Sequence, residues 1–212
     1  MFKVFSKLGF TMIELLIVIA VLGILAVAVL SAINPIEQIN RGRDTGSRSD
    51  AEQLLSAVDR FYAAKGYYPW ALDSNSINIS TNNGTTSYVE MQGANTGAID
   101  VGQDGVNMLD NLSTGGTSEL KLSFVTRLIN STQTNALFLY NLGSLPSDTS
   151  YVCFKPKSAS FREEAWKRCS NGSGALNTLP TDFPQTNACP DDATCGRALS
   201  ADLATGCNIC LP

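Results

Sequence analysis

Gly9-Phe-Thr-Met-Ile-Glu14 leads directly into an apolar run from Leu15 to Ile33 that contains no charged residue. Coiled as a helix at about 1.5 Å per residue, this run would be roughly 28 Å long. The hydrocarbon core of a bilayer is about 30 Å thick. A helix also closes all its backbone hydrogen bonds internally, as lipid requires. The sequence therefore predicts a single membrane-spanning helix near the N-terminus.

The residues that flank the run predict its orientation. Lys3 and Lys7 precede it, so the positive-inside rule places the N-terminus in the cytoplasm and the rest of the chain outside. Three arginines after the run, between positions 41 and 48, oppose this assignment. A conventional secretory signal would need a cleavage site after the apolar region, whereas Ala26-Val-Ala28 lies inside it. We therefore expect an anchor rather than a conventional signal peptide.

Glu14 is the one acidic residue at the edge of this run. An acid at the centre of a spanning helix costs about 2.5–3.5 kcal/mol, and less near the end. Removing the acid would still favour insertion, so its presence suggests a partner. A location among the lipid headgroups is the simpler alternative.

The stretch from Gly9 to Val18 resembles the class III signal of type IV pilins and type II secretion pseudopilins. The resemblance implies that a prepilin peptidase cuts after Gly9 and that Phe10 becomes the N-methylated first residue. It also implies that Glu14 pairs with the N-terminal amine of a neighbouring subunit. Such a pair would set the axial register of subunits, because an unpaired carboxylate among packed apolar helices is costly.

The same resemblance implies a life cycle and a set of partners. The subunit would be stored in the inner membrane and then polymerise with itself or with other pilins. An inner-membrane assembly platform with a cytoplasmic ATPase would drive this step, giving a filament at the cell surface or in the periplasm. Both uses stay open. The cysteine-rich tail favours a surface pilin, whereas Ile33–Ile39 and the Gly66-Tyr-Tyr-Pro69 junction are similar to the G-like group of pseudopilins.

Helical character is expected to resume after Asn34-Pro35, where proline interrupts the first helix. From Ser49 the pattern is amphipathic, and Ser49 to Glu52 reads either as a capping box or as a continuation of the same helix. Gly66 is the expected end of the helix. Apolar side chains at helical spacing form the face that should pack under a head: Leu54, Leu55, Val58, Phe61 and Tyr62.

The chain divides into a leader (1–9), an N-terminal helix (10–65) with spanning and amphipathic parts (15–33 and 49–65), and a head (66–212) with a cysteine-rich tail (153–212). Segments 136–142 and 150–155 predict strands, and Ser160 to Glu163 predicts the start of a short helix. Ser118 to Asn130 fits a strand or a helix. The predicted fold is α+β, with the long helix packed on a small antiparallel sheet.

Six cysteines lie in the last sixty residues: Cys153, Cys169, Cys189, Cys195, Cys207 and Cys210. An even number outside the cytoplasm indicates disulfides, and we expect Cys153 to pair with Cys169. Zinc is the alternative, because Cys207-Asn-Ile-Cys210 has knuckle spacing and Cys189 with Cys195 could complete four ligands. Redox chemistry by Cys207 and Cys210 is a third interpretation.

Other chemistry has little support in the sequence. The chain has no histidine, the commonest general base and metal ligand, and no catalytic motif stands out. We therefore expect no enzyme, no cofactor and no metal. Asp100–Asp104 and Asp191-Asp192 lack EF-hand spacing. The net charge is −4 and the head has no dense basic cluster, so direct nucleic-acid binding is not expected. The rival from another class is a membrane-anchored adhesin or binding protein that never polymerises.

Overall fold

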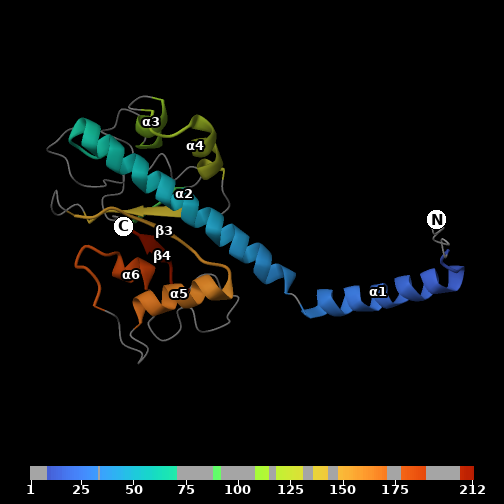
Figure 1. Cartoon of the computed structure of the whole chain (residues 1–212). Helices are drawn as coiled ribbons and strands as arrows, with labels where there is room; N and C mark the ends of the chain where they lie inside the picture. The colour runs from blue at the N-terminus through green and yellow to red at the C-terminus, as the bar shows by residue number, and fades with distance from the viewer. Residues whose placement is uncertain are drawn as a thin grey trace, which may run out of the picture. The chain divides into compact units, whose positions relative to one another are not determined.

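The structure is a computed structural model that describes residues 9–32, 34–70, 88–91, 108–114, 118–130, 136–142, 148–170, 178–189 and 206–212 (Figure 1). The chain forms two compact units, Met1–Gln38 and Ile39–Pro212. The first unit contains the apolar helix α1, and the second contains the sheet and the remaining helices of the head.

Helix α1 (Met12–Ala32) is apolar on every side. Its large side chains are exposed along its whole length, from 49% for Val18 to 90% for Met12. Within the described residues, Met12–Leu30 is the one helix long and apolar enough to cross a membrane, with a mean hydropathy of 3.1. A helix that is apolar all round needs an apolar environment on all sides, which lipid supplies. The predicted apolar N-terminal helix is confirmed.

Helix α2 (Pro35–Lys65) begins where proline is best tolerated, at the first helical position. Asn34 precedes it, and its side-chain oxygen accepts a hydrogen bond from the Glu37 backbone N–H at 3.3 Å. The helix then runs unbroken through Ser49. The capping-box interpretation of Ser49 is therefore wrong, because this residue lies inside a continuous helix that starts well before position 49.

The predicted core-facing side of α2 is confirmed for four residues, Leu54, Leu55, Val58 and Phe61, which are buried. Tyr62 is instead 36% exposed and packs against Tyr68 with ring centroids 4.6 Å apart. Gly66 ends the helix as expected. Its φ of +78° is a left-handed conformation that favours glycine, and its N–H donates to Tyr62 O at 2.8 Å.

A four-stranded antiparallel sheet forms the centre of the head, with strand order β1-β2-β3-β4. The strands are β1 (Tyr88–Glu90), β2 (Leu137–Tyr140), β3 (Tyr151–Phe154) and β4 (Ile209–Leu211). The two central strands lie inside the segments predicted from sequence. Strand β4 was not predicted. It pairs with β3 through Phe154 opposite Ile209 and Cys153 opposite Cys210, which brings the C-terminus into the core.

Four short helices complete the described part of the head: α3 (Met108–Ser113), α4 (Leu122–Ile129), α5 (Ala159–Cys169) and α6 (Gln185–Ala188). In the view of Figure 1, α3 and α4 lie above the strands and α5 and α6 below them. Helix α4 resolves the ambiguous segment, because Phe124, Val125 and Leu128 are buried at helical spacing. The predicted cap of α5 is wrong by two residues: Ser158, not Ser160, accepts the Phe161 N–H.

The core of the head joins the buried face of α2 to the sheet and to the short helices. Its largest fully buried side chains include Leu54, Leu112, Leu139, Phe154 and Ile209. The α+β class, with the long helix leading into a small antiparallel sheet, is therefore confirmed. The two aspartate segments that lack EF-hand spacing, Asp100–Asp104 and Asp191-Asp192, lie outside the described residues.

Candidate functional site: the capped apolar helix and the disulfide-tied head

Thr11 and Glu14 form a reciprocal cap at the start of α1. Glu14 Oε2 accepts hydrogen bonds from the Thr11 backbone N–H at 2.8 Å and from the Thr11 hydroxyl at 2.6 Å. In return, the Glu14 N–H donates to Thr11 Oγ1 at 3.3 Å. Because α1 begins at Met12, Thr11 is the N-cap residue and Glu14 the third residue of the helix. This spacing is that of a capping box.

The cap gives Glu14 a local partner within its own chain. A carboxylate in the first turn also lies near the positive end of the helix dipole, which lowers the cost of its charge. The sequence pointed to a partner for this acid, but Thr11 was not identified as one. The threonine-x-x-glutamate spacing before an apolar run was the signal that could have identified it.

Gly9 and Phe10 lie just before the helix, in non-helical backbone. Phe10 is 86% exposed, and a side chain added at Gly9 would meet nothing within 4 Å. The Gly9–Phe10 peptide bond is thus outside the hydrogen-bonded helix and open on its surface. This placement suits cleavage, because a peptidase requires accessible backbone outside regular structure.

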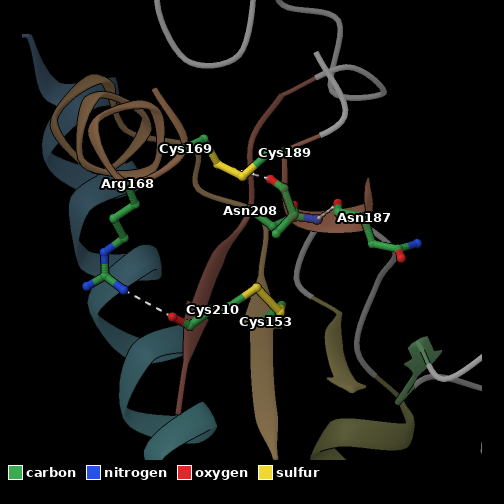
Figure 2. Close-up of a disulfide and its surroundings, with 8 residues drawn as sticks. Cys153, Arg168, Cys169, Asn187, Cys189, Asn208 and Cys210 are labelled. Atoms are coloured by element: carbon green, nitrogen blue, oxygen red, sulfur yellow. Dashed lines mark hydrogen bonds between the residues drawn. A yellow bond between two sulfur atoms is a disulfide. The ribbon is translucent and has the colours of Figure 1, made fainter. Parts of the chain in front are cut away.

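Two disulfides correct the predicted cysteine pairing. Cys153 bonds Cys210, its register partner on the neighbouring strand β4. Cys169, the last residue of α5, bonds Cys189 at the end of α6. The expected Cys153–Cys169 bond is therefore wrong. The error follows from the missed strand β4, which places Cys210 rather than Cys169 beside Cys153 (Figure 2).

The zinc interpretation is also contradicted for the cysteines that the structure describes. The sulfur atoms of Cys169, Cys189 and Cys207 all lie within 4.8 Å of one another and are buried. A metal binds thiolates, however, and all three cysteines are in disulfide bonds. Cys207 and Cys210 belong to different disulfides, which excludes a redox pair between them. Cys195 lies outside the described residues.

Polar contacts reinforce the attachment of the C-terminal segment (Figure 2). The Asn208 N–H donates to Ala188 O at 2.9 Å, and its side-chain amide donates to Asn187 O at 3.1 Å. Arg168 of α5 donates to Cys210 O at 3.0 Å. These bonds and the two disulfides tie β4 to β3, α5 and α6, so the tail is an integral part of the head.

A buried carboxylate on α2 connects the long helix to the head. Asp44 is 1% exposed and accepts hydrogen bonds from Lys157 N at 2.9 Å, Ser158 N at 2.7 Å and Ser158 Oγ at 2.6 Å. Those N–H groups precede the first turn of α5. Asp44 therefore supplies, from another helix, the anionic partner that a helix N-terminus favours. Nothing in the sequence around Asp44 indicated this role.

One turn further along α2, an ion-pair network adds to this connection. Arg48 donates to Glu164 at 2.6 Å, and its guanidinium lies 4.9 Å from the centre of the Phe161 ring. Arg168 contacts the same Glu164 oxygen at 2.9 Å. All three charged side chains are partly exposed, so the network helps to position α5 against α2 but adds little to the free energy of unfolding.

An open groove of about 760 Å³ lies between the outer face of α2 and α4. Ion pairs Arg60–Glu119 and Arg127–Asp50 cross between the two sides, at 2.6 and 2.7 Å. Burial raises the pKa of Asp50, although the Arg127 charge opposes that effect. The groove is lined mainly by serine, glutamine and charged side chains, a surface suited to polar contacts.

Taken together, an apolar N-terminal helix of spanning length and a disulfide-tied head are typical of a protein anchored in a membrane by one helix. Residues 5–30 match the family model described as the prokaryotic N-terminal methylation motif, the class III prepilin signal. This motif belongs to a structural, pilin-type family rather than to an enzyme family. No curated protein and no solved structure matches the chain.

Proposed function

We propose that this chain is a structural subunit of a type IV pilus-like filament. One observation carries the proposal: a capped acid at Glu14 directly follows the exposed Gly9–Phe10 bond and opens a helix whose large apolar side chains are exposed. The matched methylation motif, which implies processing by a prepilin peptidase and polymerisation with pilins, supports the same function.

In this proposal α1 has two successive environments. Before assembly, lipid surrounds its apolar surface, with the N-terminus in the cytoplasm. After extraction, α1 helices of neighbouring subunits replace the lipid and form the filament core. Lipid tails are as apolar as leucine, so hydrophobicity does not favour helix association within the bilayer. A polar contact that forms only between subunits would supply the missing specificity.

Glu14 is suited to that contact. Cleavage after Gly9 converts the Phe10 amide nitrogen into an amino group, which methylation leaves cationic. Glu14 Oε2 is already bonded to Thr11. Its second oxygen would then accept the amino terminus of a neighbouring subunit, while Thr11 keeps the side chain aimed along the helix. Subunits out of axial register would lose this pair, and the cost of a negative charge without a cationic partner among apolar helices would reject them.

The N-terminus of the mature chain tests the proposal. The full chain should be recovered from cells with and without a prepilin peptidase, and its intact mass and N-terminal peptide measured. We expect loss of residues 1–9 and one added methyl group on Phe10 only where the peptidase is present. A chain that still begins at Met1 beside an active peptidase, or one that begins after Ala28, would contradict it.

The type II secretion pseudopilin is the alternative within the same class. It shares processing and the Glu14 contact but forms a periplasmic filament. Electron microscopy of cells that carry the chain separates the two uses: labelled filaments on the cell surface indicate a pilus, and labelled filaments confined to the periplasm indicate a pseudopilus. The inner-membrane platform and its ATPase are expected partners in both cases.

The non-polymerising binding protein is the candidate from a different class. The polar groove between α2 and α4 is the feature that favours it, because a soluble polar ligand would find both charges and hydroxyl groups there. It predicts an unprocessed N-terminus and no effect of replacing Glu14. The same mass measurement therefore discriminates between this function and a filament subunit.

A further inference from the structure

We propose that Arg43, Lys157 and Ile39 form a binding site for the phosphate headgroup of an anionic phospholipid, next to the membrane-proximal end of α2. The site would hold the head against the membrane surface before assembly. It requires that α1 is inserted in a membrane, but it does not require filament assembly. Its failure can therefore be distinguished from failure of the proposed function.

The two cations come from separate elements that Asp44 brings together. Arg43 precedes Asp44 on α2, and Asp44 accepts the Lys157 backbone N–H at 2.9 Å. Two further bonds from Ser158, at 2.7 and 2.6 Å, fix the loop before α5 against this turn of the helix. Arg43 is exposed and Lys157 is half-buried, and the charge of Arg43 acts on Lys157, so the two cations lie at one patch of surface.

The charges at this patch favour an anion. Burial lowers the pKa of Lys157, and the nearby Arg43 charge lowers it further, although Asp44 acts in the opposite direction. Asp44 is itself 1% exposed and its oxygens accept four hydrogen bonds, so its charge faces the interior. A phosphate oxygen between the two cations would relieve their repulsion.

An exposed apolar side chain lies one helical turn from Arg43. Ile39 is 56% exposed and lies four residues before Arg43, which places both on one face of α2. An apolar residue beside a basic one is the pattern of a helix at a membrane interface, where the alkyl stem of arginine lies along the lipid and its guanidinium reaches the headgroups. Ile39 would not contribute to the binding of a soluble phosphate ion, which has no apolar part.

Chain connectivity sets an upper limit on the distance between this patch and the end of the spanning helix. Helix α1 ends at Ala32 and α2 begins at Pro35, so the start of α2 lies within about 11 Å of the end of the spanning helix at any angle between them. Arg43 is about 12 Å further along the helix axis. Lipid binding would also give a role to Arg43, one of the arginines after the apolar run that oppose the orientation expected from the positive-inside rule. Arg48, in contrast, is already paired with Glu164.

Native mass spectrometry of the full chain in a non-ionic detergent tests the site. The wild-type chain should be offered phosphatidylglycerol and, separately, phosphatidylcholine. We expect preferential retention of phosphatidylglycerol. The double variant R43Q/K157Q should lose about 25-fold in phosphatidylglycerol affinity, since each basic residue near the surface contributes roughly fivefold. The control K65Q/K121Q removes two exposed cations elsewhere and should retain the lipid.

The outcomes separate a lipid site from a free-anion site and from a contact between subunits. Substituting the Lys157 side chain leaves its backbone bond to Asp44, so the variant should keep the wild-type melting temperature; if R43Q/K157Q melts early, the single variants replace it. Equal retention of both lipids, or an unchanged double variant, would overturn the proposal. Displacement of the lipid by excess inorganic phosphate would also overturn it, because that result indicates a free-anion site. A change in the dimer fraction of the double variant without a change in lipid retention would overturn it too, because that result indicates a subunit contact.

Discussion

Asp44 of α2 and Ser158 at the start of α5 are joined by two hydrogen bonds, from Ser158 N at 2.7 Å and Ser158 Oγ at 2.6 Å to the same carboxylate oxygen. Ser158 is fully buried and is also the N-cap of α5, accepting the Phe161 N–H. One carboxylate therefore positions a helix that lies more than a hundred residues away in sequence. This contact couples the membrane-proximal half of α2 to the head.

Replacing Asp44 with alanine should destabilise the head strongly. The change leaves the part-buried Lys157 N–H, the buried Ser158 N–H and the buried Ser158 hydroxyl without their anionic partner, and hydrogen bonds to charged groups are worth about 1.5–3 kcal/mol each, with incomplete additivity. We expect the free energy of unfolding to fall by about 2–4 kcal/mol. Urea unfolding of the full chain in detergent, followed by tryptophan fluorescence, measures this loss.

Glu52→Ala is the matched control for Asp44, because Glu52 is an exposed acid on the same helix. Its removal should change the free energy of unfolding by less than about 0.5 kcal/mol. If the two variants unfold at the same urea concentration, the buried contact does not stabilise the head.

The two described disulfides should contribute unequally to stability. Cys153–Cys210 spans 57 residues and Cys169–Cys189 spans 20. In the chain-entropy model, loops of these lengths are worth about 4 and about 3 kcal/mol. Replacing both cysteines of a pair with serine should therefore cost more for Cys153–Cys210, and urea unfolding of the two double variants gives the order. Equal losses would indicate that strain or residual unfolded structure outweighs loop length.

Peptide mapping without reduction checks the pairing itself. We expect separate linked peptides for the two described bonds. Cys207 is disulfide-bonded and Cys195 is the one cysteine left, so a third linked peptide should join those two residues. A peptide that joins Cys153 to Cys169 would contradict the pairing across β3 and β4.

The regular parts of the fold were predictable from local patterns. Spacing of apolar residues predicted α1 and the buried side of α2, and glycine chemistry predicted the end of α2 at Gly66. The strands β2 and β3 were also found by their composition. These elements share one property: the residues that decide them are neighbours in sequence.

Features that depend on distant residues were missed. Strand β4 has only three residues, and its pairing with β3 decides the partner of Cys153. Asp44 looked like any polar residue on a helix, since its partners lie at Lys157 and Ser158. The Thr11–Glu14 cap is different, because it is local and could have been read from sequence.

Asp182 should make the stability of the head depend on acid. Burial acts to raise its pKa, but hydrogen bonds from Thr149 and Tyr151 outweigh burial and hold the pKa below the ordinary value. Because the folded-state pKa is lower than the unfolded one, the stabilisation is complete above about pH 4 and is lost as the pH falls through the folded pKa. Asp182→Asn should therefore melt earlier than wild type near neutral pH.

The pH profile separates this effect from a general loss of packing. Melting temperatures of wild type and Asp182→Asn should converge only as the pH falls through the lowered folded-state pKa of Asp182, because the carboxyl is then protonated and both side chains are neutral. A constant difference at every pH would show that the carboxylate charge contributes nothing. The Thr149 N–H, which lies 2.8 Å from Asp182 Oδ2, still has an oxygen acceptor at position 182 in the wild type and in the Asp182→Asn variant.

Thr11 and Glu14 should affect filament assembly in distinguishable ways. Glu14→Gln keeps an oxygen that can accept the Thr11 bonds but removes the charge that would pair with a neighbouring amino terminus. We expect normal membrane insertion and processing, with filament yield reduced at least about tenfold, since loss of a charged pair of about 1.4 kcal/mol or more at each subunit contact has that effect. Thr11→Ala removes the hydroxyl and the γ-methyl group but keeps the backbone N–H at position 11, which can still bind Glu14. This variant should assemble, with a smaller loss in yield. Sedimentation of sheared filaments, with membrane fractions as the reference for expression, measures both. If Glu14→Gln assembles as wild type does, the charge has no part in subunit contact, and the acid serves only as the cap of its own helix.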